Sequence, residues 1–561
     1  LRHISSLCNT VVVTCASRSS LPPLVPAVHS VAICDQEDFI LPSLLHIIVD
    51  ETFSESSLDN GFTLIPPTLH TFAETIATDV HELFPQTNVN IVITPASRVS
   101  SYYGYVYLTL SPTTNDTLAS GAHTTEGYEL IASPGGVTIT GTGAKGAFWG
   151  TRTLLQGLVQ NEGHFPSVTI RDHPDWPTRG IMLDVGRHWY PMAFLKEMCA
   201  YASWFKMNEF AGPTQHVHLS DNISPMGHPD AYARFRLRSA NPALAGLTPY
   251  LNETYTREEF DDLQTTCARR GVTITPEIES PGHALVITQW KPQLALSNDP
   301  TLLNLSVPDA IPTVKSIWKA EFLPWFHTGT DDDSSRDLSC IDWGLTEQVS
   351  IGADEAAFIE TESGKRIRIW STNEPSNKTS VSKAVIKQHW EFFEGDPFGL
   401  IKQGYDVINS EDSIHYIVMK APQTHVRTEV HTQPGAYPQR LNQTRLWDGA
   451  NVGTGGIWDP HICNASNNPT ITEPLLQGSI MAVWNDHGPN ASTPLEAYYA
   501  VKEGLPVIAA ANWQAASRPN HLTHPQFLQA FPILEASAPG QNLARRVPSR
   551  TDLVARYDWV A

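Results

Sequence analysis

The sequence predicts an α/β protein of two domains, in which a small sheet-and-helix domain precedes a (β/α)8 TIM barrel. The first observation is length, since 561 residues exceed what one ordinary hydrophobic core holds. The second is the order of elements beyond residue 175, where short apolar runs alternate with helical segments, as in parallel barrels. The third is the proline-rich stretch DHPDWPT at 172–178, which separates the two parts.

The smaller domain is expected at residues 40–170, as an antiparallel sheet with helices. Its strand signals are apolar runs and alternating apolar and polar residues, and its helix signals are apolar residues at helical spacing. A Pro-Gly-Gly sequence at 134–136 predicts a turn inside the last strand pair. The predicted strands are 46–49, 90–92, 102–110 and 128–140, and the predicted helices are 71–83 and 144–158.

The barrel is expected at residues 175–515, because eight short buried strands can be placed there with a connecting segment after each. The predicted strands are 179–186, 216–221, 272–280, 349–354, 366–371, 406–410, 479–486 and 507–513. Residues 1–30 are expected to be the remnant of a signal or pro-segment. Residues 516–561 are expected to form a helical tail.

Composition narrows the class of partner. A net charge of −21 disfavours nucleic acid and anionic membranes, and the 15 tryptophans favour a flat ligand such as a sugar ring. No run of 18 apolar residues appears, so no membrane span is predicted. Eight N-x-S/T sequons predict a glycoprotein of the secretory pathway, either extracellular or vacuolar. The seven cysteines predict no particular pairing, and the sequence predicts no particular oligomeric state.

Polar and aromatic residues follow several of the predicted barrel strands. The fourth strand ends in two adjacent carboxylates, Asp354 and Glu355. Neighbouring side chains on a regular strand point to opposite faces, so both acids reach one pocket only if the strand ends there. Catalytic residues of barrels lie at the carboxyl ends of strands, and two acids in different surroundings can divide acid and base roles. The pair therefore predicts acid–base chemistry.

Five stretches occur in a fixed order along the predicted barrel. They are RGIMLDVGRH at 179–188, VHLSDN at 217–222, PEIESPGH at 276–283, IGADE at 351–355 and AVWND at 482–486. This set resembles family 20 glycoside hydrolases, the β-N-acetylhexosaminidases. The resemblance implies an exo-glycosidase that removes terminal β-linked N-acetylhexosamine from chitooligosaccharides or glycoconjugates. It also implies retention of configuration, with the sugar's own 2-acetamido oxygen as nucleophile.

The resemblance implies a role for each candidate site residue. Glu355 would protonate the leaving oxygen and then activate water, while Asp354 would orient the acetamido group. Substrate contacts are implied for Arg179, Trp370, Trp390, Tyr416, Trp484 and Asp486, and a supporting shell for Asp221, Glu279 and His283. The resemblance implies a carbohydrate substrate, no cofactor and no metal.

Three alternatives stay open at this point. The Trp484-Asn485-Asp486 ending also resembles lacto-N-biosidases, which release disaccharides. An apparent insertion at 211–216 would suit a homologue that binds glycans without cleaving them. The spacing of His216 and His218 puts two imidazoles on one face of a strand, as a metal-dependent barrel hydrolase requires. The sequence does not decide between N-acetylglucosamine and N-acetylgalactosamine.

Overall fold

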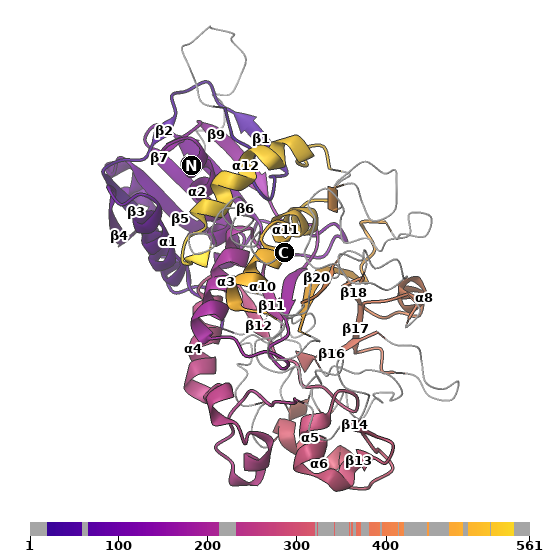
Figure 1. Ribbon diagram of the computed structural model, residues 1–561. Helices are drawn as coiled ribbons and strands as arrows, with labels where there is room; N and C mark the ends of the chain where they lie inside the picture. Colours follow the sequence, from indigo (N-terminus) through magenta and orange to yellow (C-terminus); the bar gives the residue numbers. More distant parts are fainter. Residues whose placement is uncertain are drawn as a thin grey trace, which may run out of the picture.

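The protein has two domains side by side, seen in a computed structural model (Figure 1). The first is the indigo-to-violet α/β domain, and the second is a curled parallel sheet with helices outside it. The structure describes residues 20–58, 65–211, 232–319, 323, 341–342, 358, 361–362, 366–371, 381–392, 395–412, 415–419, 446–447, 470–485, 492–515 and 518–543. No helix among these residues is long and apolar enough to cross a membrane.

The first domain is built on a seven-stranded sheet in the order β1-β9-β6-β7-β5-β3-β4. Its elements are β1 Ser30–Ile33, β2 Phe39–Ile40, β3 Leu44–Asp50, α1 Leu69–Leu83, β4 Asn88–Thr94, β5 Tyr105–Leu110, β6 Tyr128–Ser133, β7 Gly136–Gly141, α2 Ala144–Gln160, β8 His164–Phe165 and β9 Val168–Asp172. Helix α1 starts at Thr68, whose side chain accepts a hydrogen bond from the Thr71 amide, and buries Leu69, Phe72 and Ile76 on one face.

The expectation of an antiparallel sheet is wrong for half of this domain. Strand β3 pairs in parallel with β4 and β5, and β5 pairs in parallel with β7, whereas β6, β9 and β1 pair antiparallel. The physical reason is the helix α1 between β3 and β4, because a helical crossover returns the chain in the same direction. The sheet is therefore mixed.

The chain joins this fold earlier than expected. Leu24 and Val25 are buried in the core, and Gln156 of α2 bonds both the amide and the carbonyl of Val25. Strand β1 then begins at Ser30. The expected unstructured segment at 1–30 is therefore too long, because residues 20–30 belong to the first domain.

The second domain is a sheet of parallel strands in the order β12-β11-β10-β20-β18-β17-β16-β15, with β19 beside β20. Its elements are β10 Thr178–Leu183, α3 Met192–Trp204, β11 Glu209–Ala211, α4 Arg257–Ala268, β12 Thr273–Thr275, α5 Leu285–Trp290, β13 Ala295–Leu296, β14 Asp299–Leu303, α6 Ala310–Ile317, β15 Ile341–Asp342, β16 Ile367–Trp370, β17 Ile386–His389, α8 Pro397–Lys402, β18 Val407–Asn409, β19 Tyr416–Val418, β20 Leu476–Trp484, α10 Pro494–Val501, α11 Leu505–Trp513 and α12 His524–Ser537. The architecture is a TIM-barrel-like domain.

Several strand positions differ from expectation. Residues 507–513 were expected as the eighth strand but lie in helix α11, because a mostly apolar run has no clear periodicity and its alanines favour helix. Strands β15, β17 and β19 are absent from the expected set, and the polar sequence IKQH of β17 gives no sign that it is buried. The described second strand is β11 at Glu209–Ala211. The predicted strands at 216–221 and 349–354 lie outside the described residues.

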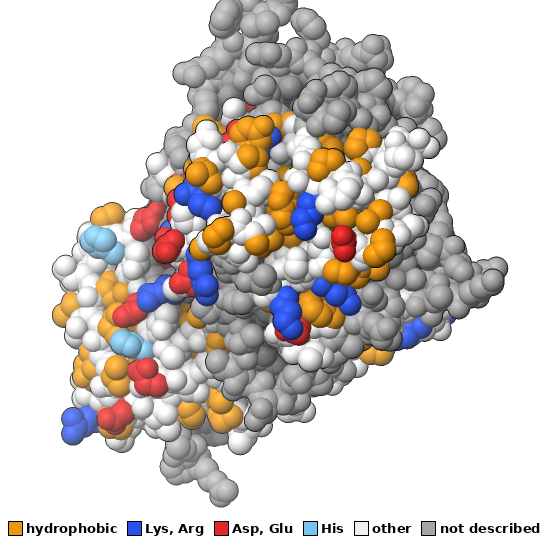
Figure 2. All heavy atoms as spheres, turned by 90° about the horizontal axis from the view of Figure 1, so that it is seen from below, with side chains coloured by type: hydrophobic (Ala, Val, Ile, Leu, Met, Phe, Trp, Pro, Cys, Tyr) orange, Lys and Arg blue, Asp and Glu red, His pale blue; other side chains and the backbone are white. Residues whose placement is uncertain are grey.

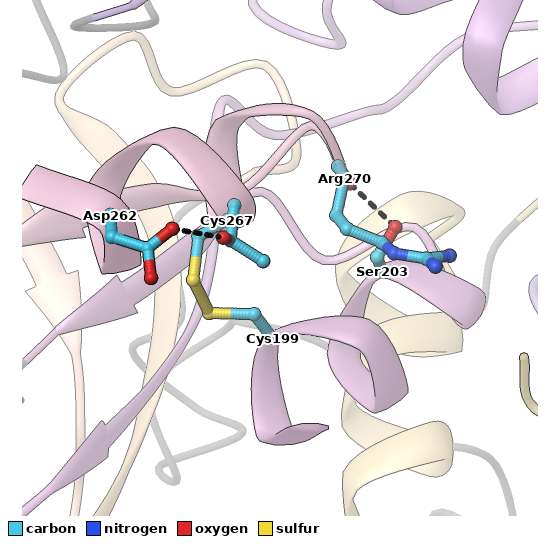
Figure 3. Close-up of a disulfide and its surroundings, with 6 residues drawn as sticks. Cys199, Ser203, Asp262, Cys267 and Arg270 are labelled. Carbon is cyan, nitrogen blue, oxygen red and sulfur yellow. Dashed lines mark hydrogen bonds between the residues drawn. A yellow bond between two sulfur atoms is a disulfide. The ribbon is translucent and has the colours of Figure 1, made fainter. Parts of the chain in front are cut away.

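One disulfide joins two helices of the barrel (Figure 3). Cys199 of α3 and Cys267 of α4 are both buried and are bonded to each other across 68 residues of sequence. The Ser203 hydroxyl donates to the carbonyl of Arg270 beside it. The bond ties together the helices on either side of strand β11.

Candidate active site

Four aromatic residues meet at the carboxyl ends of the barrel strands. Trp370 and Trp484 are the last residues of β16 and β20, and Trp390 directly follows β17. Tyr416 opens β19, but it reaches the same end because β19 pairs with the last residues of β20, Tyr416 opposite Ala482. The ring centres of Trp370 and Trp484 are 5.3 Å apart, and Tyr416 lies 5.6 Å from Trp484 and 6.1 Å from Trp390. All four positions were singled out from the sequence. The structure brings them together, while their contact with a sugar stays a prediction.

Two of the three tryptophans are held by hydrogen bonds from their indole N–H groups. Trp370 Nε1 donates to Glu277 Oε1 at 2.9 Å, and Trp390 Nε1 donates to the Ser371 carbonyl at 3.1 Å. Trp370 and Trp484 are buried, whereas Trp390 is only half-buried. A fixed wall of flat rings with one partly open member is suited to stacking on a sugar.

Buried carboxyls lie beside this wall. Glu277 and Glu279, just beyond β12, are 1% and 0% exposed, and the two side chains interact with each other. Burial, aided by the charge of Asp184, raises the pKa of Glu277 to about 8, although hydrogen bonds from Trp370 and Glu279 act in the opposite direction. Glu277 therefore keeps a proton at neutral pH. The sequence singled out Glu279 but missed Glu277, which stands two residues earlier in the same motif.

His283 lies in the loop that follows these acids. Its φ of 50° is in the left-handed region, where a residue other than glycine is uncommon, and its side chain is half-buried. Backbone positions of this kind cluster at functional sites. Its place in a supporting shell stays a prediction.

Arg179 does not belong to this end of the barrel. It is the second residue of β10, so it lies at the amino end of the strand, and it is fully buried. Its guanidinium bonds Glu126 of the first domain and the carbonyls of Trp176 and Lys206. The expectation that Arg179 grips the substrate is wrong, because its buried guanidinium is already occupied by Glu126 of the first domain and by backbone carbonyls at the amino end of the barrel.

Arg187, unlike Arg179, lies beyond the carboxyl end of β10, where the candidate site is. It follows the strand by four residues and is 4% exposed, and its guanidinium lies 5.2 Å from the centre of the Trp484 ring. Arg187 Nη1 donates to Asp184 Oδ2 at 3.2 Å, and the amide of Asn485 donates to the same oxygen. The sequence signal that separates the two arginines is position along the strand, since only carboxyl ends face the site.

A buried ion pair crosses the barrel interior. Arg368 of β16 and Glu209 of β11, neither of them exposed, are joined by two hydrogen bonds of 2.5 and 3.1 Å. The strands that carry them are not neighbours in the sheet, so the pair spans the lumen. A bidentate pair of this kind fixes the distance between opposite walls.

The remaining candidates lie outside the described residues. These are Asp221, Asp354, Glu355 and Asp486, together with the possible metal ligands His216 and His218. Among the described residues, His29, His173 and Asp175 lie within reach of one cation. The two imidazoles are stacked, and both ring nitrogens of His29 already bond Asp172 and Asp175. Stacked rings do not direct their nitrogens at one ion, so this group is better described as a hydrogen-bonded network.

A cavity of about 310 Å³ opens at the opposite end of the barrel. Thr178, Ile386 and Leu476 line it, and these residues begin β10, β17 and β20. Because barrel enzymes work at the carboxyl ends of their strands, this cavity is distinct from the candidate site.

The fold and the site together define a class of protein. A parallel barrel preceded by an α/β domain, with aromatic rings, an arginine and a protonated acid at the strands' carboxyl ends, is the arrangement of a barrel enzyme that binds a ring-shaped ligand. Residues 176–331 match the model of the glycosyl hydrolase family 20 catalytic domain, and residues 21–173 match family 20 domain 2. Together these matches cover more than half of the chain. The chain belongs to glycosyl hydrolase family 20.

Individual relatives agree with this assignment. A β-hexosaminidase of Porphyromonas gingivalis is 35% identical over 179 residues, which are 30% of this chain and 22% of the relative. A lacto-N-biosidase of Bifidobacterium bifidum is 23% identical over 424 residues, or 70% of this chain and 33% of the relative. The chain thus spans less than two thirds of these curated relatives. A mutant β-hexosaminidase of Streptomyces plicatus, solved with its product GlcNAc, superposes with a TM-score of 0.66 at 18% identity, covering 93% of this chain and 96% of that one.

Proposed function

We propose that this protein is an exo-β-N-acetylhexosaminidase, which removes terminal β-linked N-acetylhexosamine with retention of configuration. The observation that carries the proposal is the aromatic wall of Trp370, Trp390, Tyr416 and Trp484 at the strand ends of a family 20 barrel. Relatives with β-hexosaminidase names and a neighbour solved with GlcNAc support the same substrate class.

In the proposed mechanism the sugar supplies its own nucleophile. The 2-acetamido oxygen attacks the anomeric carbon, Glu355 protonates the leaving oxygen, and Asp354 orients the acetamido N–H and stabilises its developing charge. Glu355 then removes a proton from the water that opens the intermediate. Arg187 takes the role expected of Arg179 and binds the sugar's hydroxyls, which its position beside Trp484 supports.

Release of a chromophore from an aryl N-acetyl-β-glucosaminide tests the proposal directly. Glu355→Gln should lower kcat/KM on oligosaccharides by roughly 10²–10⁴-fold, the range of general acid catalysis. Proton NMR of the first product should show the β-anomer. An oligosaccharide turned over normally by Glu355→Gln, or an α-anomer as first product, would refute the mechanism. A wild-type protein that binds N-acetylglucosamine without hydrolysing any glycoside would support the glycan-binding alternative.

Disaccharide release is the second candidate, and the similarity to a lacto-N-biosidase favours testing it. We expect an aryl monosaccharide donor to react faster than the matching aryl disaccharide donor. The reverse order would assign the protein to the disaccharide-releasing branch.

A metal-dependent hydrolase that uses His216 and His218 is the other alternative. Retained activity after prolonged treatment with a chelator would exclude it.

We also propose that the protein acts in the secretory pathway or outside the cell. The buried Cys199–Cys267 disulfide supports an oxidising compartment, because such bonds are rare in the cytosol. The sequons at Asn115 and Asn252 support it too, since both side chains are exposed. Acidic and basic side chains lie interspersed on the face in Figure 2, which suits a neutral ligand better than a polyanion. Secretion from a eukaryotic host should give protein that loses mass on treatment with peptide N-glycosidase.

A further inference from the structure

Glu277 is a buried acid with a specific partner in the aromatic wall. It lies two residues beyond β12, and its Oε1 accepts the Trp370 indole N–H at 2.9 Å. Glu279, which is also buried, lies beside it and interacts with it. Burial disfavours the charged form of a carboxyl, so Glu277 keeps its proton at neutral pH.

The orientation of Trp370 depends on the hydrogen bond from its indole N–H to Glu277. An indole has one hydrogen-bond donor and no acceptor, and a buried donor without a partner is unfavourable. Trp370 is 2% exposed, and its ring lies 5.3 Å from Trp484 and 6.3 Å from Tyr416. A rotation of this ring would therefore displace the wall on which a sugar is expected to stack.

We propose that Glu277 is a positioning residue, which fixes the plane of Trp370 by accepting the indole N–H. The inference rests on the proposed function, because only a sugar-binding wall makes the orientation of Trp370 matter for turnover. Glu277 acts through Trp370 and is not assigned a role at the reacting atoms.

A double-mutant cycle tests the link. Glu277→Gln keeps a carbonyl acceptor, so its kcat/KM should stay within about 3-fold of wild type. Glu277→Leu removes the acceptor and should lower kcat/KM by about 10²-fold, the size expected when a binding group is misplaced by about 1 Å. Trp370→Phe removes the donor, so Glu277→Leu added to it should cost no more than about 3-fold further. Equal losses in both backgrounds would overturn the proposal.

A second measurement does not need turnover. In protein labelled with 15N-tryptophan, the resonance lost in Trp370→Phe identifies the Trp370 indole N–H. This resonance should move in Glu277→Leu, and in Glu277→Asp if the leucine variant does not fold, because aspartate falls one methylene short. In the wild type it should also titrate near pH 8, under the charges of Asp184, Arg368 and Glu279, and it should stop titrating in Glu277→Gln.

The two measurements separate the two proposals. A resonance that moves as described in a protein that hydrolyses no N-acetylhexosaminide would uphold the role of Glu277 and refute the proposed function. A resonance that does not respond to Glu277 substitution refutes the positioning role, whatever the enzyme's activity.

Discussion

His29 should make the junction of the two domains depend on pH. Burial lowers its pKa, but hydrogen bonds and charges from Asp172 and Asp175 outweigh this and raise the pKa from 6.5 to about 9. The distances are 3.0 Å from Nδ1 to Asp172 and 3.4 Å from Nε2 to Asp175. Lys206 and Arg518 face the same two carboxylates. The folded protein therefore holds the His29 proton more tightly than the unfolded chain does.

The size and sign of the effect follow from this shift. At about 1.36 kcal/mol per pKa unit, the raised pKa corresponds to roughly 3 kcal/mol of folding free energy. A pKa that is higher in the folded state stabilises the fold fully below about pH 6.5. That stability is lost as pH rises from 6.5 through 9. Burial and the charge of His29 lower the pKa of neighbouring His173, so His173 does not oppose the trend in this window.

The assay compares His29→Gln with the wild type in urea at pH 6 and pH 9.5. Because a two-domain chain need not unfold in one step, the quantity compared is the free energy of the first transition. We expect the wild type to lose about 3 kcal/mol more than the variant between the two pH values. Subtracting the change in unfolding free energy of His29→Gln from that of the wild type removes the contribution of groups that titrate in both proteins. Identical pH dependence of the two proteins would refute the reasoning.

Three further outcomes are expected. Arg187→Gln should lower kcat/KM by about 10–100-fold, the scale of a charged hydrogen bond; a fall confined to stability would contradict its site role. Arg179→Ala should instead destabilise the fold by about 3–5 kcal/mol, because Glu126 would be left buried and unpaired; normal stability with raised KM would restore the original expectation. Cys199→Ser with Cys267→Ser should cost about 2–4 kcal/mol of unfolding free energy, and an unchanged urea midpoint would show that the bond is not formed in solution.

The sequence predicted the positions of the aromatic wall better than the positions of the charges. Trp370 and Trp484 lie near the ends of the predicted strands 366–371 and 479–486, so the strand prediction places them at the rim. Arg179 and Arg187 stand in one motif eight residues apart, and only the strand boundary shows which end each occupies. Glu277 looked like part of a strand, because its partnership with Trp370 joins residues 93 apart in sequence.

Helix and strand were hardest to distinguish where burial is complete. Residues 507–513 were expected as a strand because they are mostly apolar, and β17 was missed because its buried sequence IKQH is mostly polar. A fully buried element shows no alternation of polar and apolar residues from which to choose. The mixed sheet of the first domain was also missed. Strand direction follows from the crossover through α1 and not from the composition of the strands themselves.

Two buried acids of the first domain, Glu126 and Asp172, pair with buried cations of the barrel. Glu126 accepts hydrogen bonds from Arg179, the Trp149 indole and Asn208. Asp172 accepts hydrogen bonds from Lys206 and the Trp513 indole. Acids of the first domain therefore complete the amino-terminal end of the barrel. A fragment trimmed to the barrel would leave two buried cations without counter-ions. Shortened versions made for crystallography or engineering should therefore be cut elsewhere, and the two domains should be inherited, expressed and evolved as one unit.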